Sequence, residues 1–185
     1  MEELLEGHSF LRVHHSYLGG LLEHTTSIAA MADSVIGLYP EINADLLLTG
    51  VLLHDIGKVR EYTWDTDIDY TDEGTLVGHV VLGDEMVAAA IAILPGFPED
   101  LALRVRHMIV SHHGRYEWGS PRRPQTLEAM ALHQIEELDS QVNRFRELLV
   151  NRPEGESWTP YDRLLGRSLY AGRDDLSIEE QSREE

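Results

Sequence analysis

The stretch Val51-Leu52-Leu53-His54-Asp55-Ile56-Gly57-Lys58 decides the fold, because an apolar helical run ends there in an imidazole and a carboxylate. Histidine and aspartate are both metal ligands, and the two oxygens of Asp55 allow it to contact two ions at once. Gly57 suits the left-handed residue that closes a helix, and Lys58 follows where a cation complements the negative helix end. A His-Asp pair at a helix end is also a common cap, so the octapeptide alone does not establish a metal site.

The composition indicates one acidic domain. At 185 residues the chain is long enough to bury a core, and without cysteine any metal must be held by nitrogen and oxygen. The formal net charge is -18; residues 173–185 contribute -4 and leave -14 for the rest, which argues against an extended nucleic-acid-binding surface. The acidic start lacks the basic region of a secretory signal, and no apolar stretch is long enough to span a bilayer. We therefore expect a cytoplasmic protein with no membrane partner.

Helical periodicity dominates the sequence, and strand-like alternation is scarce, which predicts an all-α bundle. We expect one domain over residues 1–171 and a disordered acidic tail over 172–185. Asn43 is expected to cap the second helix. The polar segment 61–74 is expected to form a loop or a short hairpin. The predicted helices are 14–38, 43–56, 75–94, 99–113, 126–150 and a short one near 160–170.

Histidine and aspartate recur on the apolar faces of these helices. With ~100° per helical residue, a polar side chain on a core-facing stripe needs a partner, because burying it alone is costly. One such histidine is usually a satisfied core residue, whereas several on separate helices that point at one interior position make a metal centre. The inward-facing set comprises His24, His54, Asp55, His79, His112, His113 and Asp139.

The order of these residues resembles the HD-domain metal-dependent phosphohydrolase superfamily, in the subgroup that holds two ions. The local phrases are closer still to the HD domain of the YhaM-type 3′→5′ exoribonucleases. They are HHSYLGGLLEHT (14–25), LLHDIGK (52–58), YTDEGTLVGH (70–79), SHHGRYEWGSP (111–121) and the helix around Asp139. Ordered matches over roughly residues 14–145 are a specific signal, unlike an isolated His-Asp pair.

The resemblance implies an HD-domain helical bundle around a buried centre of two divalent metal ions, with Mn, Fe, Ni and Co all suited to the ligands. The ligands implied for the first ion are His24, His54, Asp55 and Asp139. Those implied for the second are His79, His112 and His113, with Asp55 bridging. Two ions ~3.5–4 Å apart lower the pKa of a shared water and clamp the attacking and leaving oxygens of an in-line displacement at phosphorus. The expected activity is a two-metal phosphodiesterase acting on nucleotides or short RNA 3′ ends.

Some residues outside the ligand set are candidates for contact with substrate. Lys58 is expected to act with Asp55 in catalysis by neutralising a phosphate oxygen, although a solvated lysine at a helix end accounts for its position equally well. Arg122 and Arg123 can bind phosphate and Trp118 can stack a base. A structural tryptophan beside solvated arginines is the competing interpretation of that segment.

The pocket mouth and the support of the ligands have candidates of their own. His14 and Tyr17 would line the mouth, since the resembling family carries the same phrase. Glu23 and Asp84 are candidates for orienting the ligating imidazoles, but ordinary surface charge explains both equally well.

The match to the exoribonucleases fails at two points. That family is expected to carry an OB-type nucleic-acid-binding domain ahead of its HD domain, and here about a dozen residues precede the first phrase. Arg115 stands where the family phrase is expected to have an acidic residue. Phosphoester chemistry is therefore implied, but processive degradation of long RNA is not. A nucleotide, a short RNA or another small phosphate ester is the expected substrate.

Two other functions fit the same residues. A few HD-domain proteins that resemble this ligand set use a mixed-valent di-iron centre to oxidise a substrate. Lys58 and the arginines favour phosphate over that chemistry. A non-catalytic nucleotide-sensing module is the other alternative, and the presence of the whole ligand set argues against it.

Overall fold

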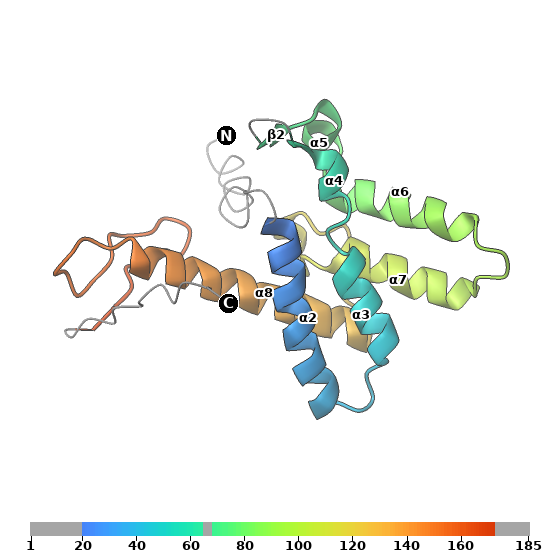
Figure 1. The fold of residues 1–185 in the computed structure, drawn as a ribbon, viewed down its shortest axis with the longest axis horizontal. Coiled ribbons are helices and arrows are strands. Elements are labelled where there is room, and N and C mark those ends of the chain that lie inside the picture. Colours follow the sequence, from blue (N-terminus) through green and yellow to red (C-terminus); the bar gives the residue numbers. More distant parts are fainter. Residues whose placement is uncertain (1–19, 65–67, 173–185) are drawn as a thin grey trace, which may run out of the picture. The chain divides into compact units, whose positions relative to one another are not determined.

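The computed structural model describes residues 20–64 and 68–172 (Figure 1). The chain divides into two compact units, one ending at Asp139 and the other beginning at Ser140. The long helices are α2 (Gly20–Leu38), α3 (Ala44–Leu53), α6 (His79–Ala92), α7 (Glu99–Ser111) and α8 (Leu127–Val150). Shorter elements are α4 (Lys58–Glu61), β1 (Tyr62–Trp64), β2 (Ile68–Tyr70), α5 (Asp72–Leu76) and the 3₁₀ turn η2 (Tyr116–Trp118). The prediction of an all-α fold is confirmed.

Apolar stripes of four helices form the core of the unit that ends at Asp139. Each stripe follows the helical period, so α2, α3, α7 and the first half of α8 bury one face each. The fully buried members include Ile28, Leu47, Val51, Met108, Ile109 and Leu132. α3 begins where expected, because the Asn43 side chain accepts a hydrogen bond of 3.0 Å from the backbone nitrogen of Leu46.

The polar segment after α4 forms the short hairpin that the sequence allowed. β1 and β2 pair antiparallel, with Tyr62 opposite Tyr70 and Thr63 opposite Asp69. The hydroxyl of Tyr62 donates to that of Tyr70 at 3.2 Å, which joins the two strands through their side chains. The hairpin follows α4 directly and leads into α5, so it joins the His-Asp segment to the segment that carries His79.

Two helix predictions were wrong. The single helix predicted over 75–94 is split into α5 and α6 at Gly78, whose φ of 81° is open to glycine and interrupts the helical path. The short helix predicted near 160–170 is absent. Instead Asp162 and Arg167 form an isolated antiparallel bridge around Gly166, which has a φ of 63°.

Candidate metal centre

The His-Asp segment leaves α3 in helical conformation and then packs tightly on α6. His54 is fully buried, and its backbone nitrogen donates to the Gly50 carbonyl at 2.8 Å. Gly57 has a φ of -61°, so the predicted left-handed conformation was wrong. Glycine is needed there for a different reason: a Cβ atom would lie 2.0 Å from the carbonyl oxygen of His79. This close approach sets Asp55 beside the first turn of α6.

Asp55 lies at the middle of the cluster, with a different pair of histidines at each oxygen. Its Oδ1 atom is 3.5 Å from His79 Nε2 and 3.8 Å from His112 Nε2. Its Oδ2 atom is 3.5 Å from His54 Nε2 and 3.8 Å from His24 Nε2. These separations are longer than typical hydrogen bonds. They are close to the separation between two ligand atoms that bind the same ion, each at ~2.1 Å from it. The carboxylate therefore lies between two pairs of imidazoles.

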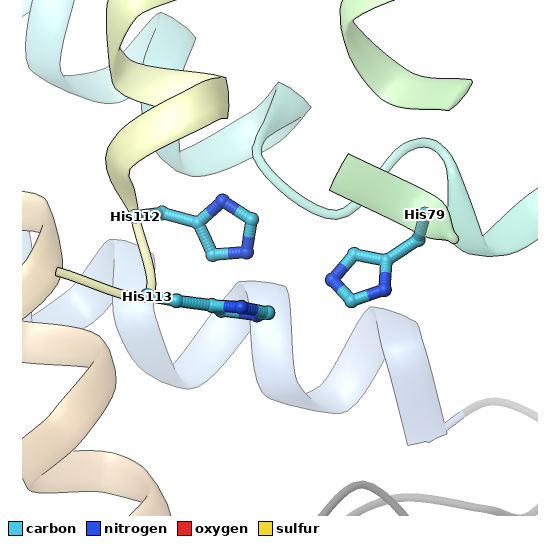
Figure 2. Close-up of side chains that lie close together, drawn as sticks. All are labelled: His79, His112 and His113. Carbon is cyan, nitrogen blue, oxygen red and sulfur yellow. The ribbon is translucent and has the colours of Figure 1, made fainter. Parts of the chain in front are cut away.

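One group of ligand atoms comes from the α6–α7 hairpin and is called here the hairpin trio: His79, His112 and His113. One nitrogen of each ring lies within 4.8 Å of the others. Figure 2 shows the three imidazoles turned toward one another, His79 from the start of α6 and the other two from the end of α7. The centroids of the His112 and His113 rings are 4.2 Å apart.

A second group, called here the α8 trio, comprises His24, His54 and Glu136, and its ligand atoms also lie within 4.8 Å of one another. It draws on α2, the end of α3 and α8. Asp139 lies one turn further along α8, where its Oδ2 atom is 3.0 Å from His24 Nδ1. Asp139 therefore contacts the far side of the His24 ring, and Glu136 is the α8 carboxylate grouped with the histidine nitrogens.

The orientation of the rings leaves nitrogen lone pairs in the centre. Carbonyl oxygens only accept, so His54 Nδ1 donates to Val51 at 2.8 Å and His112 Nδ1 donates to Ile109 at 2.6 Å. The Nδ1 atom of His79 donates to Glu61 at 3.1 Å. In the neutral form of each ring the Nε2 lone pair then faces the centre, and among the described residues these three buried Nε2 atoms and Asp55 Oδ1 have no hydrogen-bond partner. A divalent cation satisfies atoms of this kind, so the residues fit a metal.

The comparison with known families agrees with this geometry. Residues 21–141 match the HD domain family. The chain belongs to the HD-domain family. It is 38% identical over 157 residues to the 3′-5′ exoribonuclease YhaM of Bacillus pumilus, which covers 85% of this chain and 50% of that protein. The YhaM exoribonucleases of Shouchella clausii and Listeria monocytogenes are 37% and 39% identical, over 91% and 86% of this chain and 53% and 51% of theirs.

The chain therefore spans about half the length of the curated relatives it matches. No solved structure matches the chain significantly. Among the described residues, no helix combines the length and the apolar character needed to cross a bilayer.

Burial shifts the pKa values of residues in both trios. Burial lowers the pKa of His112 well below its usual value, and burial followed by the charge of His79 lowers that of His113 to about 3. His112 and His113 therefore supply neutral imidazoles, the form that binds metals. Burial raises the pKa of Glu136 to about 8. A bound cation would reverse that shift by favouring the carboxylate.

Lys58 lies against the Asp55 carboxylate, as its spacing from Asp55 implied. Its Nζ atom donates to Asp55 Oδ2 at 2.6 Å. Burial would raise the pKa of Asp55, but the charges of Lys58 and His54 lower it well below its usual value. Burial would likewise lower the pKa of Lys58, but the Asp55 carboxylate raises it. Both groups are charged, and the Lys58 ammonium lies beside the Asp55 carboxylate within the histidine cluster.

The remaining candidates for substrate contact lie on the segment after His113 or outside the described residues. Trp118 is 43% exposed, and the Arg115 guanidinium stacks on its ring. Arg122 and Arg123 are both exposed but line different pockets, Arg122 with Asp84 and Arg106, and Arg123 with His133. His14 and Tyr17 lie outside the described residues.

Two acids at the site were missed by the sequence interpretation. One is Glu61, which accepts hydrogen bonds from both the ring and the backbone nitrogen of His79. Of the two acids expected to support the imidazoles, Asp84 instead accepts two hydrogen bonds from Arg106, and Glu23 is exposed. The signal for Glu136 was its place one helical turn before Asp139, on the same side of α8. Glu61 had no comparable signal, because its contact with His79 depends on how α4 meets α6.

Proposed function

We propose that the chain is a metal-dependent phosphohydrolase that binds two divalent cations and hydrolyses phosphodiester bonds in nucleotides or at short RNA 3′ ends. The observation that carries the proposal is the bridge: each oxygen of Asp55 faces the Nε2 atoms of two buried histidines. The printed names of the relatives, 3′-5′ exoribonucleases, support phosphodiester chemistry on RNA. Because this chain spans about half of those proteins, their whole activity is not carried over.

The ligand sets follow from the two trios. The hairpin trio would hold one ion and the α8 trio the other, with Asp55 shared between them. Glu136 takes the ligand role that the sequence resemblance implied for Asp139, and Asp139 orients the His24 ring through its Nδ1 atom. The donor set contains only nitrogen and oxygen, which suits Mn, Fe, Co or Ni.

The chain's own residues then position the reaction. A bound pair of cations supplies an activated water and positive charge for the phosphate oxygens. Lys58, held at Asp55 by a hydrogen bond of 2.6 Å, is placed to donate to a phosphate oxygen that reaches the centre. The imidazoles around Asp55, which is 3% exposed, limit the water that can screen these charges.

Hydrolysis of bis(p-nitrophenyl) phosphate and of short 3′-hydroxyl RNAs tests the proposal, with the protein loaded separately with Mn²⁺, Co²⁺, Ni²⁺ or anaerobic Fe²⁺. We expect metal-dependent release of p-nitrophenol and of mononucleotides, and a loss of at least ~100-fold in rate for Asp55→Asn. Glu154→Gln, an exposed acid of the other unit, is the matched control and should react at the unmodified rate. Absence of hydrolysis with every metal and every phosphodiester contradicts the proposal.

A further inference from the structure

A second pocket begins at the residue that follows the paired histidines. It has a volume of about 510 Å³ and is lined by Gly114, Arg115, Glu117, Arg123 and His133, among others. We call it the arginine pocket. All of its lining residues belong to the unit that contains the metal centre.

The wall of the arginine pocket is continuous with the backbone of the hairpin trio. His133 Nδ1 donates to the backbone carbonyl of His112 at 2.9 Å. Gly114 packs so closely on the same ring that a Cβ atom would lie 2.2 Å from His133. A ligand held in this pocket is therefore beside the loop that carries His112 and His113.

The two arginines of the pocket are held in place by aromatic rings and not by acids. The guanidinium carbon of Arg115 lies 4.4 Å from the centroid of the Trp118 ring, and that of Arg123 lies 5.2 Å from the Tyr116 ring. Stacking of this kind fixes the plane of a guanidinium and leaves its N–H groups free to donate. Within residues 20–64 and 68–172, neither arginine forms an ion pair, whereas Arg60, Arg104 and Arg106 all do.

The loop that carries these arginines is also tied down. The backbone nitrogens of Trp118 and Ser120 both donate to the carbonyl of Arg115, at 3.1 Å each. The Ser120 hydroxyl donates to the carbonyl of Arg122 at 2.6 Å. The residues that line the arginine pocket include two arginines, Arg115 and Arg123, and one carboxylate, Glu117. The pocket is therefore net positive, although the whole chain has a formal charge of -18.

We propose that the arginine pocket binds a phosphate group of the substrate other than the one that is hydrolysed. Two planar guanidinium groups match the oxygens of a phosphate, which accepts paired N–H donors. The inference rests on the proposed phosphodiesterase function and narrows it: the substrate carries at least two phosphates, as an oligonucleotide does. Arg122, which lines the other pocket, has no part in this site.

Equilibrium binding of a phosphorothioate-linked adenosine trinucleotide to the Mn²⁺-loaded protein tests the inference, with calorimetry as the readout. We expect Arg115→Gln and Arg123→Gln each to raise the Kd about tenfold, and the double variant more. Arg115→Lys keeps the charge but loses the planar pair of donors, so its Kd should fall between those of Arg115→Gln and the unmodified protein. Arg146→Gln, an exposed arginine on the far part of α8, is the matched control and should change the Kd less than twofold.

The failure of this inference is distinguishable from failure of the proposed function. Bis(p-nitrophenyl) phosphate carries a single phosphate, so its hydrolysis reports on the metal centre. If that hydrolysis occurs but the double variant binds the trinucleotide within twofold of the unmodified protein, the arginine pocket is not a phosphate subsite. An equal loss in Arg146→Gln also overturns it, because the effect would then be one of net charge. A tenfold loss confined to the pocket variants supports it even where no hydrolysis is seen.

Discussion

Glu61 Oε1 lies 3.1 Å from the Nδ1 atom of His79 and 2.9 Å from its backbone nitrogen. One buried carboxylate oxygen thus fixes both the ring and the start of α6. Burial would raise the pKa of Glu61, but the hydrogen bonds and charge of His79 lower it, so the group is ionised. A carboxylate behind an imidazole sets its tautomer and increases its basicity toward a metal.

Removal of Glu61 should therefore weaken metal binding. We expect Glu61→Ala to reduce the affinity for Mn²⁺ by about 10–100-fold, and Glu61→Gln by less, because the amide still offers an acceptor oxygen. Titration calorimetry of the metal-free protein measures both. Glu85→Ala, an exposed acid on α6, is the control. Unchanged affinity in Glu61→Ala would show that His79 needs no support.

The two acids of α8 should differ in what they do for the metal. We expect Glu136→Ala to lose one of two bound ions, because it removes a member of the α8 trio. Asp139→Ala should retain both ions with an affinity lower by about 10–100-fold, since it removes only the support of His24. Native mass spectrometry after metal loading gives the number of ions per chain. The reverse result would restore Asp139 as the ligand.

Gly57 should not tolerate a side chain. Since an added Cβ atom would lie 2.0 Å from the His79 carbonyl, Gly57→Ala should lower the free energy of unfolding by about 1–3 kcal/mol or more. Gly37→Ala is the matched control, because a Cβ atom there has no neighbour within 4 Å. In the helix α2 it should be neutral or stabilising by about 0.5–1 kcal/mol. Urea unfolding compares them, and equal stability of both variants would refute the packing argument.

Glu128 should make stability depend on pH in the acid range. Its Oε1 atom accepts from the Asn43 backbone nitrogen at 3.1 Å, and its Oε2 atom accepts from Arg104 at 3.2 Å. Burial would raise the pKa of Glu128, but hydrogen bonds from its own backbone nitrogen and from that of Asn43, together with the charge of Arg104, lower it. A pKa that is lower in the folded state stabilises above the unfolded value of ~4.3, and this stabilisation is lost as the pH falls through the folded value.

Glu128→Gln should therefore unfold more easily by about 1–3 kcal/mol at pH 7, with a difference that shrinks below pH ~4. Urea unfolding at several pH values measures it. Asp100→Asn, which removes an exposed acid 4.0 Å from the same Arg104, should cost about 0.5 kcal/mol or less. A difference for Glu128→Gln that persists at low pH would mean that packing and not charge is responsible.

Periodicity and capping predicted most of the helices, because those signals are local. The Asn43 cap and the runs of α7 and α8 follow from neighbouring residues alone. The break at Gly78 was missed because apolar residues continue on both sides of it. The bridge between Asp162 and Arg167 was missed because a turn there competes with helical propensity.

The site was predicted less completely than the fold. Asp139 was expected to face inward, and it is 8% exposed. The same periodicity did not single out Glu136, whose carboxylate is grouped with His24 and His54. Glu136 and Asp139 contact different parts of the histidine cluster. These contacts depend on how α2 packs near α8, and no local sequence pattern encodes that packing.

The hairpin trio comes from consecutive helices. The α8 trio joins α2 and the end of α3 to α8, which comes last in the order of the described helices. Synthesis on the ribosome proceeds from the N-terminus, so the histidines of α6 and α7 emerge before Glu136 does. The hairpin trio can thus assemble on a nascent chain before α8 has emerged, whereas the α8 trio cannot. The emergence of α8 is therefore the event during translation after which both trios can form.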